Sequence, residues 1–194
     1  MPTIITHTVV AVAAGKAFTE GPMPRNFWRA AIISSTIADV DVLAFFFGIP
    51  YEHFFGHRGF FHSLFFAFVL SIVLASIFWE HAKPFSRQWR QYFLFFFLVG
   101  SSHGLLDAMT DGGLGIALLS PFDNHRYFLP WTPIVVSPIG IRGFFSRWGL
   151  MVMISEVTYV WVPLLLFLFV FRIVMRKFYK PALIRAVPDT GRII

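Results

Sequence analysis

Residues 57–79 read HRGFFHSLFFAFVLSIVLASIFW, and they join a polar opening of two histidines, an arginine and a serine to a long apolar run. The apolar segment Phe60–Trp79 has the length that a helix needs to cross the hydrocarbon core of a bilayer, which is roughly 20 residues. The stretch therefore predicts a membrane helix with ionisable side chains at its entrance.

The whole chain has the composition of a membrane protein. Of its 194 residues, 57% are hydrophobic and only 13% are charged, and 26 are phenylalanine, whereas charged residues make up about 25% of an average soluble domain. No linker or repeat divides the chain, so we expect one domain over residues 1–194. Because cysteine is absent, disulfides, thiolate metal sites and cysteine nucleophiles are excluded.

Five segments are apolar enough to cross or nearly cross a membrane. They are Thr3–Phe18, Phe27–Phe47, Phe60–Trp79, Tyr92–Thr110 and Trp148–Phe171. The remaining long stretch, Asp111–Arg147, is rich in glycine and proline, and its Tyr127 and Trp131 suit the depth of the head groups. We expect an all-α polytopic integral membrane bundle of about five segments, with this stretch as a long outer interfacial loop that serves as a lid.

Lysine and arginine gather in three places, and these belong on the cytoplasmic side because short cytoplasmic loops collect basic residues. The basic residues are Lys16, Arg25 and Arg29; Lys83, Arg87 and Arg90; and Arg172, Arg176, Lys177, Lys180 and Arg185. With five crossings, the N-terminus is expected outside and the C-terminus in the cytoplasm. The net charge of +6 is then explained by topology and anionic lipid head groups, and no nucleic-acid partner is expected.

Each segment carries ionisable side chains in the half that this topology places outside. They are His7, Asp39, Asp41, His57, His62, His103, Asp107 and Glu156. Ionisable groups within a membrane are costly and mark functional sites by default. Since five different segments deliver them to one level, we predict a site near the outer membrane surface.

The spacing of these residues fits metal binding. His103 and Asp107 are four apart, and so are Asp107 and Asp111, which places all three on one face of a continuous helix. Asp39 and Asp41 are about 200° apart around a regular helix, so both can bind one ion only if the helix breaks; otherwise one supports the other. Imidazole with carboxylate suits Zn²⁺, Mn²⁺ or Fe²⁺, and the number of candidates allows one or two ions.

Other roles remain open for several of these residues. His7 could be an interfacial histidine, His57 and Asp111 could cap loops, Glu156 could hydrogen-bond within the bundle, and the paired aspartates could face Arg29 or Arg58. Ser63 is expected to cap the helix that follows it. Three further histidines are expected in solvated loops: His53, His81 and His125.

The motifs TH, ADVD, HRGFFHS, HGLLD and PFDNHRYFLPW, in this order, resemble the YdjM-like family of inner-membrane-associated metal-dependent hydrolases from His7 to about Gly140. The family pattern reads PDxD and HRGxTHS, so Ala38 replaces its proline and Phe61 its threonine. The resemblance implies metal binding through His7, Asp39, Asp41, His57, His62, His103 and Asp107. The order of an early histidine, an aspartate and a HxxxD helix is also similar to zinc-dependent phospholipase C.

These observations predict a hydrolase of the bacterial inner membrane that cleaves a phosphoester of a lipid or lipid-linked substrate on the extracytoplasmic side. A divalent ion there would lower the pKa of bound water from about 15.7 to about 7. Arg58, Arg126 and Arg142 are expected to bind the phosphate, and Asp41, Arg58 and Asp111 to act in catalysis. The alternatives are a divalent-cation transporter, which the apolar inner halves of the segments disfavour, and a metal-containing scaffold.

Overall fold

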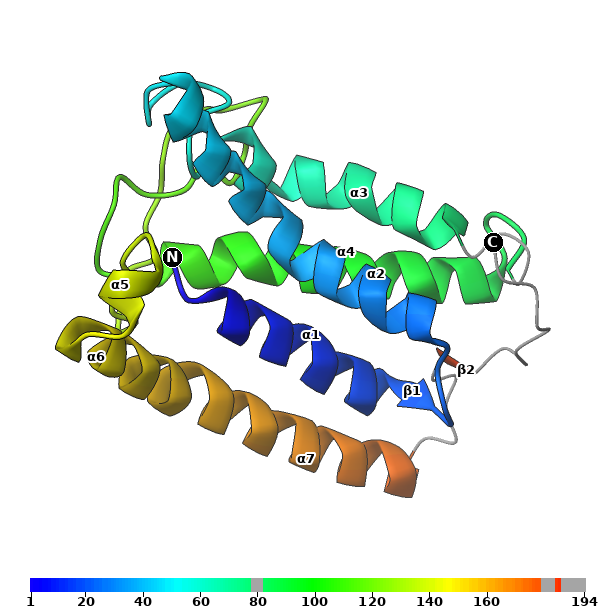
Figure 1. Cartoon of the computed structure of the whole chain (residues 1–194). Helices are drawn as coiled ribbons and strands as arrows, with labels where there is room; N and C mark the ends of the chain where they lie inside the picture. The colour runs from blue at the N-terminus through cyan, green and yellow to red at the C-terminus, as the bar shows by residue number, and fades with distance from the viewer. Residues whose placement is uncertain (78–81, 179–183, 186–194) are drawn as a thin grey trace.

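The computed structural model describes residues 1–77, 82–178 and 184–185, and in them a bundle of helices (Figure 1). The helices are α1 (Ile4–Phe18), α2 (Arg25–Thr36), α3 (Leu64–Ile77), α4 (Arg87–Ala108), α5 (Ile141–Phe144), α6 (Arg147–Glu156) and α7 (Val162–Phe178). The 3₁₀ helix η1 (Ile37–Phe47) continues α2, and the 3₁₀ helix η2 (Phe60–His62) precedes α3. A π-helical turn, η3 (Val157–Trp161), joins α6 to α7. The two-residue strands β1 (Thr19–Glu20) and β2 (Ile184–Arg185) form one parallel pair. Trp79, His81 and Lys180 lie outside the described residues.

Serine caps set the start of two helices. Ser63 Oγ accepts the backbone N–H of Phe66 at 3.0 Å, which confirms the predicted cap before α3. Ser86 Oγ accepts the N–H of Trp89 at 3.2 Å, so α4 begins at Arg87, before the predicted apolar segment Tyr92–Thr110. The polar residues after Ser86 resemble a loop in sequence, but the cap satisfies a donor of the first turn and brings them into the helix.

The prediction of a helical membrane bundle is confirmed in its helical character. Two continuous helical stretches, Arg25–Phe47 and Arg147–Val174, are long and apolar enough to cross a membrane. Helices α1 and α3 are apolar but have only 15 and 14 residues, fewer than the roughly 20 that a spanning helix needs. Five crossings therefore remain a prediction.

Phenylalanine side chains pack between the helices of the bundle. The ring of Phe27 on α2 is fully buried and lies 5.0 Å from the ring of Phe95 and 5.9 Å from that of Phe96 on α4. Small residues let the helices approach: a Cβ on Gly100 would lie 3.1 Å from Ser34 Oγ and 3.4 Å from the Ala67 side chain. Small residues at contacts between helices are typical of membrane bundles.

The ionisable side chains of the segments lie at one end of this bundle. Helices α1, α3 and α6 begin there, and η1 and α4 end there, together with the loops that follow η1 and α4 (Figure 1). The shared level inferred from the sequence is thus a shared end of the bundle.

The stretch from Asp111 to Arg147 packs against that end. The carbonyl of Leu118 accepts the N–H of Leu64 at 3.0 Å, and the N–H of Leu129 donates to Ala108 at 2.8 Å. Ile116 and Ile134 are fully buried, whereas Trp131 is 59% exposed. The stretch is therefore a cap that is hydrogen-bonded to the helices, with aromatic side chains on its outer surface.

Candidate metal centre

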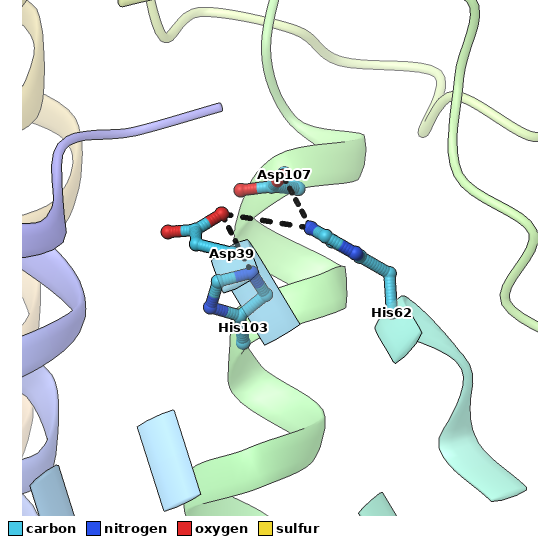
Figure 2. A group of neighbouring side chains, drawn as sticks. All are labelled: Asp39, His62, His103 and Asp107. Carbon is cyan, nitrogen blue, oxygen red and sulfur yellow. Dashed lines mark ion pairs between the residues drawn. The ribbon is translucent and has the colours of Figure 1, made fainter. Parts of the chain in front are cut away.

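Four side chains from three segments converge at the capped end: Asp39 from η1, His62 from η2, and His103 and Asp107 from α4 (Figure 2). One atom of each residue lies within 4.8 Å of the corresponding atoms of the others. His103 Nε2 is 3.4 Å from Asp39 Oδ1, and His62 Nε2 is 3.4 Å from Asp107 Oδ2 and 3.7 Å from Asp39 Oδ1. We call these four residues the metal centre.

The polar atoms that face one another in the metal centre are buried without hydrogen-bond partners. They are Nε2 of both histidines and both carboxylate oxygens of Asp39 and Asp107. Buried carboxylates without compensation cost several kcal/mol each. A divalent cation would compensate both charges, and a set of two imidazoles and two carboxylates suits Zn²⁺, Mn²⁺ or Fe²⁺.

Polar contacts at Nδ1 of each histidine leave Nε2 free to bind a cation. His103 Nδ1 is 2.8 Å from the carbonyl of Ser35, and since a carbonyl only accepts, Nδ1 carries the proton and Nε2 the lone pair. His62 Nδ1 lies 2.9 Å from Asp41 Oδ2. A carboxylate or carbonyl behind the imidazole is the usual arrangement for histidine ligands of metals.

Asp41 lies behind His62 and outside the metal centre. Its Oδ1 is 2.6 Å from His57 Nδ1, and its Oδ2 accepts the backbone N–H of Arg58 at 2.9 Å. The structure thus places Asp41 and His57 against each other and not among the four residues of the metal centre, and their predicted binding of a metal remains a prediction. Of the two alternatives for ADVD, the structure shows the one in which Asp39 faces the centre and Asp41 supports it.

His7 adjoins the metal centre through the other oxygen of Asp107. Its Nε2 lies 3.4 Å from Asp107 Oδ1, and its ring stacks on His103 with centroids 3.9 Å apart. Both His7 nitrogens are buried and without hydrogen bonds. Asp107 therefore faces His62 with one oxygen and His7 with the other.

Arg58 is buried, and its guanidinium is directed at the protein. The side chain is 1% exposed; Nη1 donates to the Gly112 carbonyl at 2.7 Å, Nη2 donates to Thr110 Oγ1 at 3.1 Å, and Nε lies 3.5 Å from Asp107 Oδ2. Its backbone has a φ of 61°, which costs a non-glycine residue about 1–3 kcal/mol. The predicted phosphate clamp is corrected: Arg58 braces Asp107 and the loop after α4.

The other predicted substrate and catalytic residues lie outside the metal centre. Arg126 donates to the carbonyls of His57 at 3.0 Å and Tyr51 at 2.6 Å, and so fixes the loop before α3. Arg142 is exposed on α5. Asp111 is also exposed and accepts the N–H of Val136 at 2.8 Å. The prediction needed α4 to continue to Asp111, but the helix ends at Ala108, so Asp111 does not share a helical face with His103 and Asp107.

Glu156 ties the last membrane segment to the start of α1. Its fully buried carboxylate accepts hydrogen bonds from the Thr3 N–H at 2.5 Å, the Thr3 hydroxyl at 2.6 Å and the Thr6 hydroxyl at 2.5 Å. A carboxylate at a helix N-terminus satisfies free donors and complements the helix dipole. Of the two roles considered for Glu156, hydrogen bonding within the bundle is the one observed.

Comparison with known proteins agrees with the sequence motifs. The family model described as YdjM inner membrane protein matches residues 1–179. The chain is also 39% identical over 168 residues to "Inner membrane protein YbcI" of Escherichia coli (strain K12), a match that covers 84% of this chain and 92% of that protein. No solved structure matches the chain. The chain therefore belongs to the YdjM family of inner membrane proteins, which is the family that HRGFFHS and HGLLD indicated.

Proposed function

We propose that this inner membrane protein is a metal-dependent hydrolase that cleaves a phosphoester of a lipid or lipid-linked substrate at the outer membrane interface. The observation that carries the proposal is the convergence of Asp39, His62, His103 and Asp107 with their buried polar atoms unpartnered. Such a set would be costly to keep buried if it bound nothing.

A divalent cation in the metal centre would lower the pKa of bound water to about 7 and polarise a phosphoryl oxygen. The chain supplies the rest of the arrangement. Ser35 and Asp41 hold His103 and His62 with Nε2 directed inward, and Arg58 holds Asp107 from the side of the cap. His7 extends the donor set toward a second ion, so one or two ions fit. Zinc suits the donors, and so do manganese and iron.

A lipid substrate is supported by the surface around the metal centre. At the same end of the bundle, Phe46, Phe47, Phe122 and Phe145 are each about four-fifths exposed, at 82%, 79%, 83% and 81%. Aromatic and apolar side chains with this exposure are stable in the interfacial layer of a membrane. The ester groups of lipids lie in that layer.

Basic residues at the opposite end of the bundle support the proposed orientation. Arg25 and Arg29 at the start of α2, Arg87 and Arg90 at the start of α4, and Arg172 near the end of α7 all lie far along the bundle from the metal centre. The positive-inside rule then places the metal centre on the extracytoplasmic side. A transporter would instead need polar groups along its path, and the part of the described bundle that lies away from the metal centre is filled by residues such as Phe27, Phe96 and Leu74.

The proposal is tested by metal analysis and phosphatase assays on the purified protein in lipid nanodiscs. We expect one or two equivalents of a divalent metal, and hydrolysis of p-nitrophenyl phosphate and phosphatidic acid. Asp107→Asn, which keeps the shape of the side chain, should lose the metal and lower the hydrolysis rate by about 10³-fold or more.

Asp111→Asn is the matched control, because Asp111 is an exposed aspartate outside the metal centre. It should keep both the metal and the rate. A correctly folded wild-type protein that binds no divalent metal, or that hydrolyses neither substrate when loaded with zinc, manganese or iron, would refute the proposed function.

A further inference from the structure

A groove of about 290 Å³ lies between α1, α4 and α7. We call it the acyl groove. Apolar side chains form almost all of its wall, including Val10, Ala14, Leu98, Val99, Leu164 and Phe167. The two polar lining residues, Gln91 and Ser102, lie near opposite ends of its α4 wall. A ligand that is apolar along its length suits such a wall, because nothing between those ends offers it a hydrogen bond.

One end of the acyl groove lies about one helical turn from His7 and His103. Val10 follows His7 by three residues on α1, and Val99 precedes His103 by four residues on α4, so each valine lies one turn from a histidine on the same helical face. The two histidine rings stack with centroids 3.9 Å apart. A ligand in the groove would therefore have one end next to His7 and His103.

The acyl groove is long enough for an extended chain. Its wall on α4 extends from Gln91 to Ser102, which is about 16 Å along a helix. At the far end, the rings of Phe18 and Phe171 are 5.0 Å apart, and Phe18 also lines the groove. A single extended acyl chain that begins near His7 and His103 and ends near Phe18 fits this length.

The rim of the acyl groove faces outward. Leu94, Leu98 and Phe167 line it and are 53%, 51% and 62% exposed. An acyl chain could enter sideways from the bilayer without crossing a polar layer. The volume is at the lower limit for cavities that hold small ligands, which favours one extended chain over a bulky group.

We infer that the acyl groove binds an acyl chain of the lipid substrate and so places the lipid's phosphoester at the metal centre. This inference rests on the proposed function, since it assigns the part of the substrate that is not cleaved. Binding through the remote chain would position the ester and raise kcat/KM for lipids above that for soluble phosphates that lack the chain.

Photocross-linking tests the groove without requiring hydrolysis. Two phosphatidic acid probes are used in nanodiscs, one with a diazirine near the carboxyl end of the acyl chain and one with a diazirine near its methyl end. We expect the first to label Val10, Val99 or Ser102, and the second to label Phe18, Leu94 or Phe167. The reverse order, or equal labelling of every exposed helix face, would overturn the inference.

Leu98→Trp fills the groove from its exposed rim and should lower this labelling about tenfold, because several methylenes of the probe would lose their contacts. The matched control is Leu166→Trp, at a 60% exposed position of α7 outside the groove, and it should leave the labelling unchanged. Both variants should keep their metal content, which shows that they fold. Equal labelling in the two variants would overturn the inference.

Kinetics separate this inference from the proposed function. Leu98→Trp should lower kcat/KM for long-chain phosphatidic acid about tenfold and leave that for p-nitrophenyl phosphate unchanged. An unchanged rate on both substrates would overturn the groove and leave the hydrolase intact. Selective labelling in a protein that hydrolyses neither substrate would refute the hydrolase and support the groove as a lipid site.

Discussion

At the scale of single residues, Asp41 is the strongest test of how the metal centre is held. Its carboxylate lies 2.9 Å from His62 Nδ1, so Asp41→Asn weakens the group that fixes the tautomer and the ring orientation of His62. We expect the metal affinity to fall about 10–100-fold, measured by competition with a chelator of known affinity. Asp111→Asn should show no change, and an equal loss in both variants would contradict this role for Asp41.

Arg58→Lys separates a structural arginine from a substrate clamp. Lysine keeps the charge but cannot reach Gly112, Thr110 and Asp107 together as the guanidinium does. We expect the free energy of unfolding to fall by about 2–4 kcal/mol, since buried polar partners lose their donors, and thermal unfolding in detergent would measure the loss. An unchanged Tm with a raised KM for phosphatidic acid would instead support the clamp that the sequence predicted.

The sequence predicted the four residues of the metal centre as ligands, but not which of the other candidates lie outside it. Spacing put His103 and Asp107 on one face, and the structure shows them together. The choice between Asp39 and Asp41 depends on the 3₁₀ geometry of η1, which the apolar pattern of that segment does not encode. The partners of Arg58 are 52 and 54 residues away along the chain, so residue type alone suggested phosphate binding.

At the scale of elements, Glu156 links the start of α1 to the turn between α6 and η3. Glu156→Ala would leave the hydroxyls of Thr3 and Thr6 and the Thr3 N–H without their acceptor. We expect a loss of about 3 kcal/mol or more in the free energy of unfolding, measured as a lower Tm in detergent. Glu52→Ala, at an exposed loop position, should keep the wild-type Tm; a similar decrease in both variants would contradict the structural role of Glu156.

Some helix ends are set by a local capping residue, and others depend on contacts between segments that are distant in the sequence. The cap at Ser63 was predictable because serine precedes an apolar run. The start of α4 was not predictable in the same way. Ser86 caps the helix, but Arg87 and Arg90 lower the hydropathy of its first turn. The stretch Asp111–Arg147 after α4 was expected to be irregular. Its hydrogen bonds to Leu64 and Ala108 were not predictable, because they join segments that only the fold brings together.

At the scale of the whole molecule, the sequence predicted that ionisable residues from five segments share one level, and the bundle brings them to one end (Figure 1). This prediction succeeded because the membrane penalises a charge at any other depth, so the composition of each segment records the position of its charges. Composition alone does not determine the number of crossings, because α1 and α3 are shorter than a full span and depend on their neighbours for burial.

The orientation of the bundle can be measured directly, because the chain has no cysteine and single cysteines can be introduced without a background. His125→Cys lies in the exposed cap near the metal centre, and Lys83→Cys lies at an exposed position near the start of α4 at the opposite end. If the basic residues mark the cytoplasmic side, a membrane-impermeant maleimide should label His125→Cys in intact bacteria and Lys83→Cys only after lysis. The opposite pattern would place the metal centre in the cytoplasm, where water-soluble phosphoesters would compete with lipids for it. Labelling of both positions in intact cells would show that the two ends share the outer side, and the bundle would then not cross the membrane along its length.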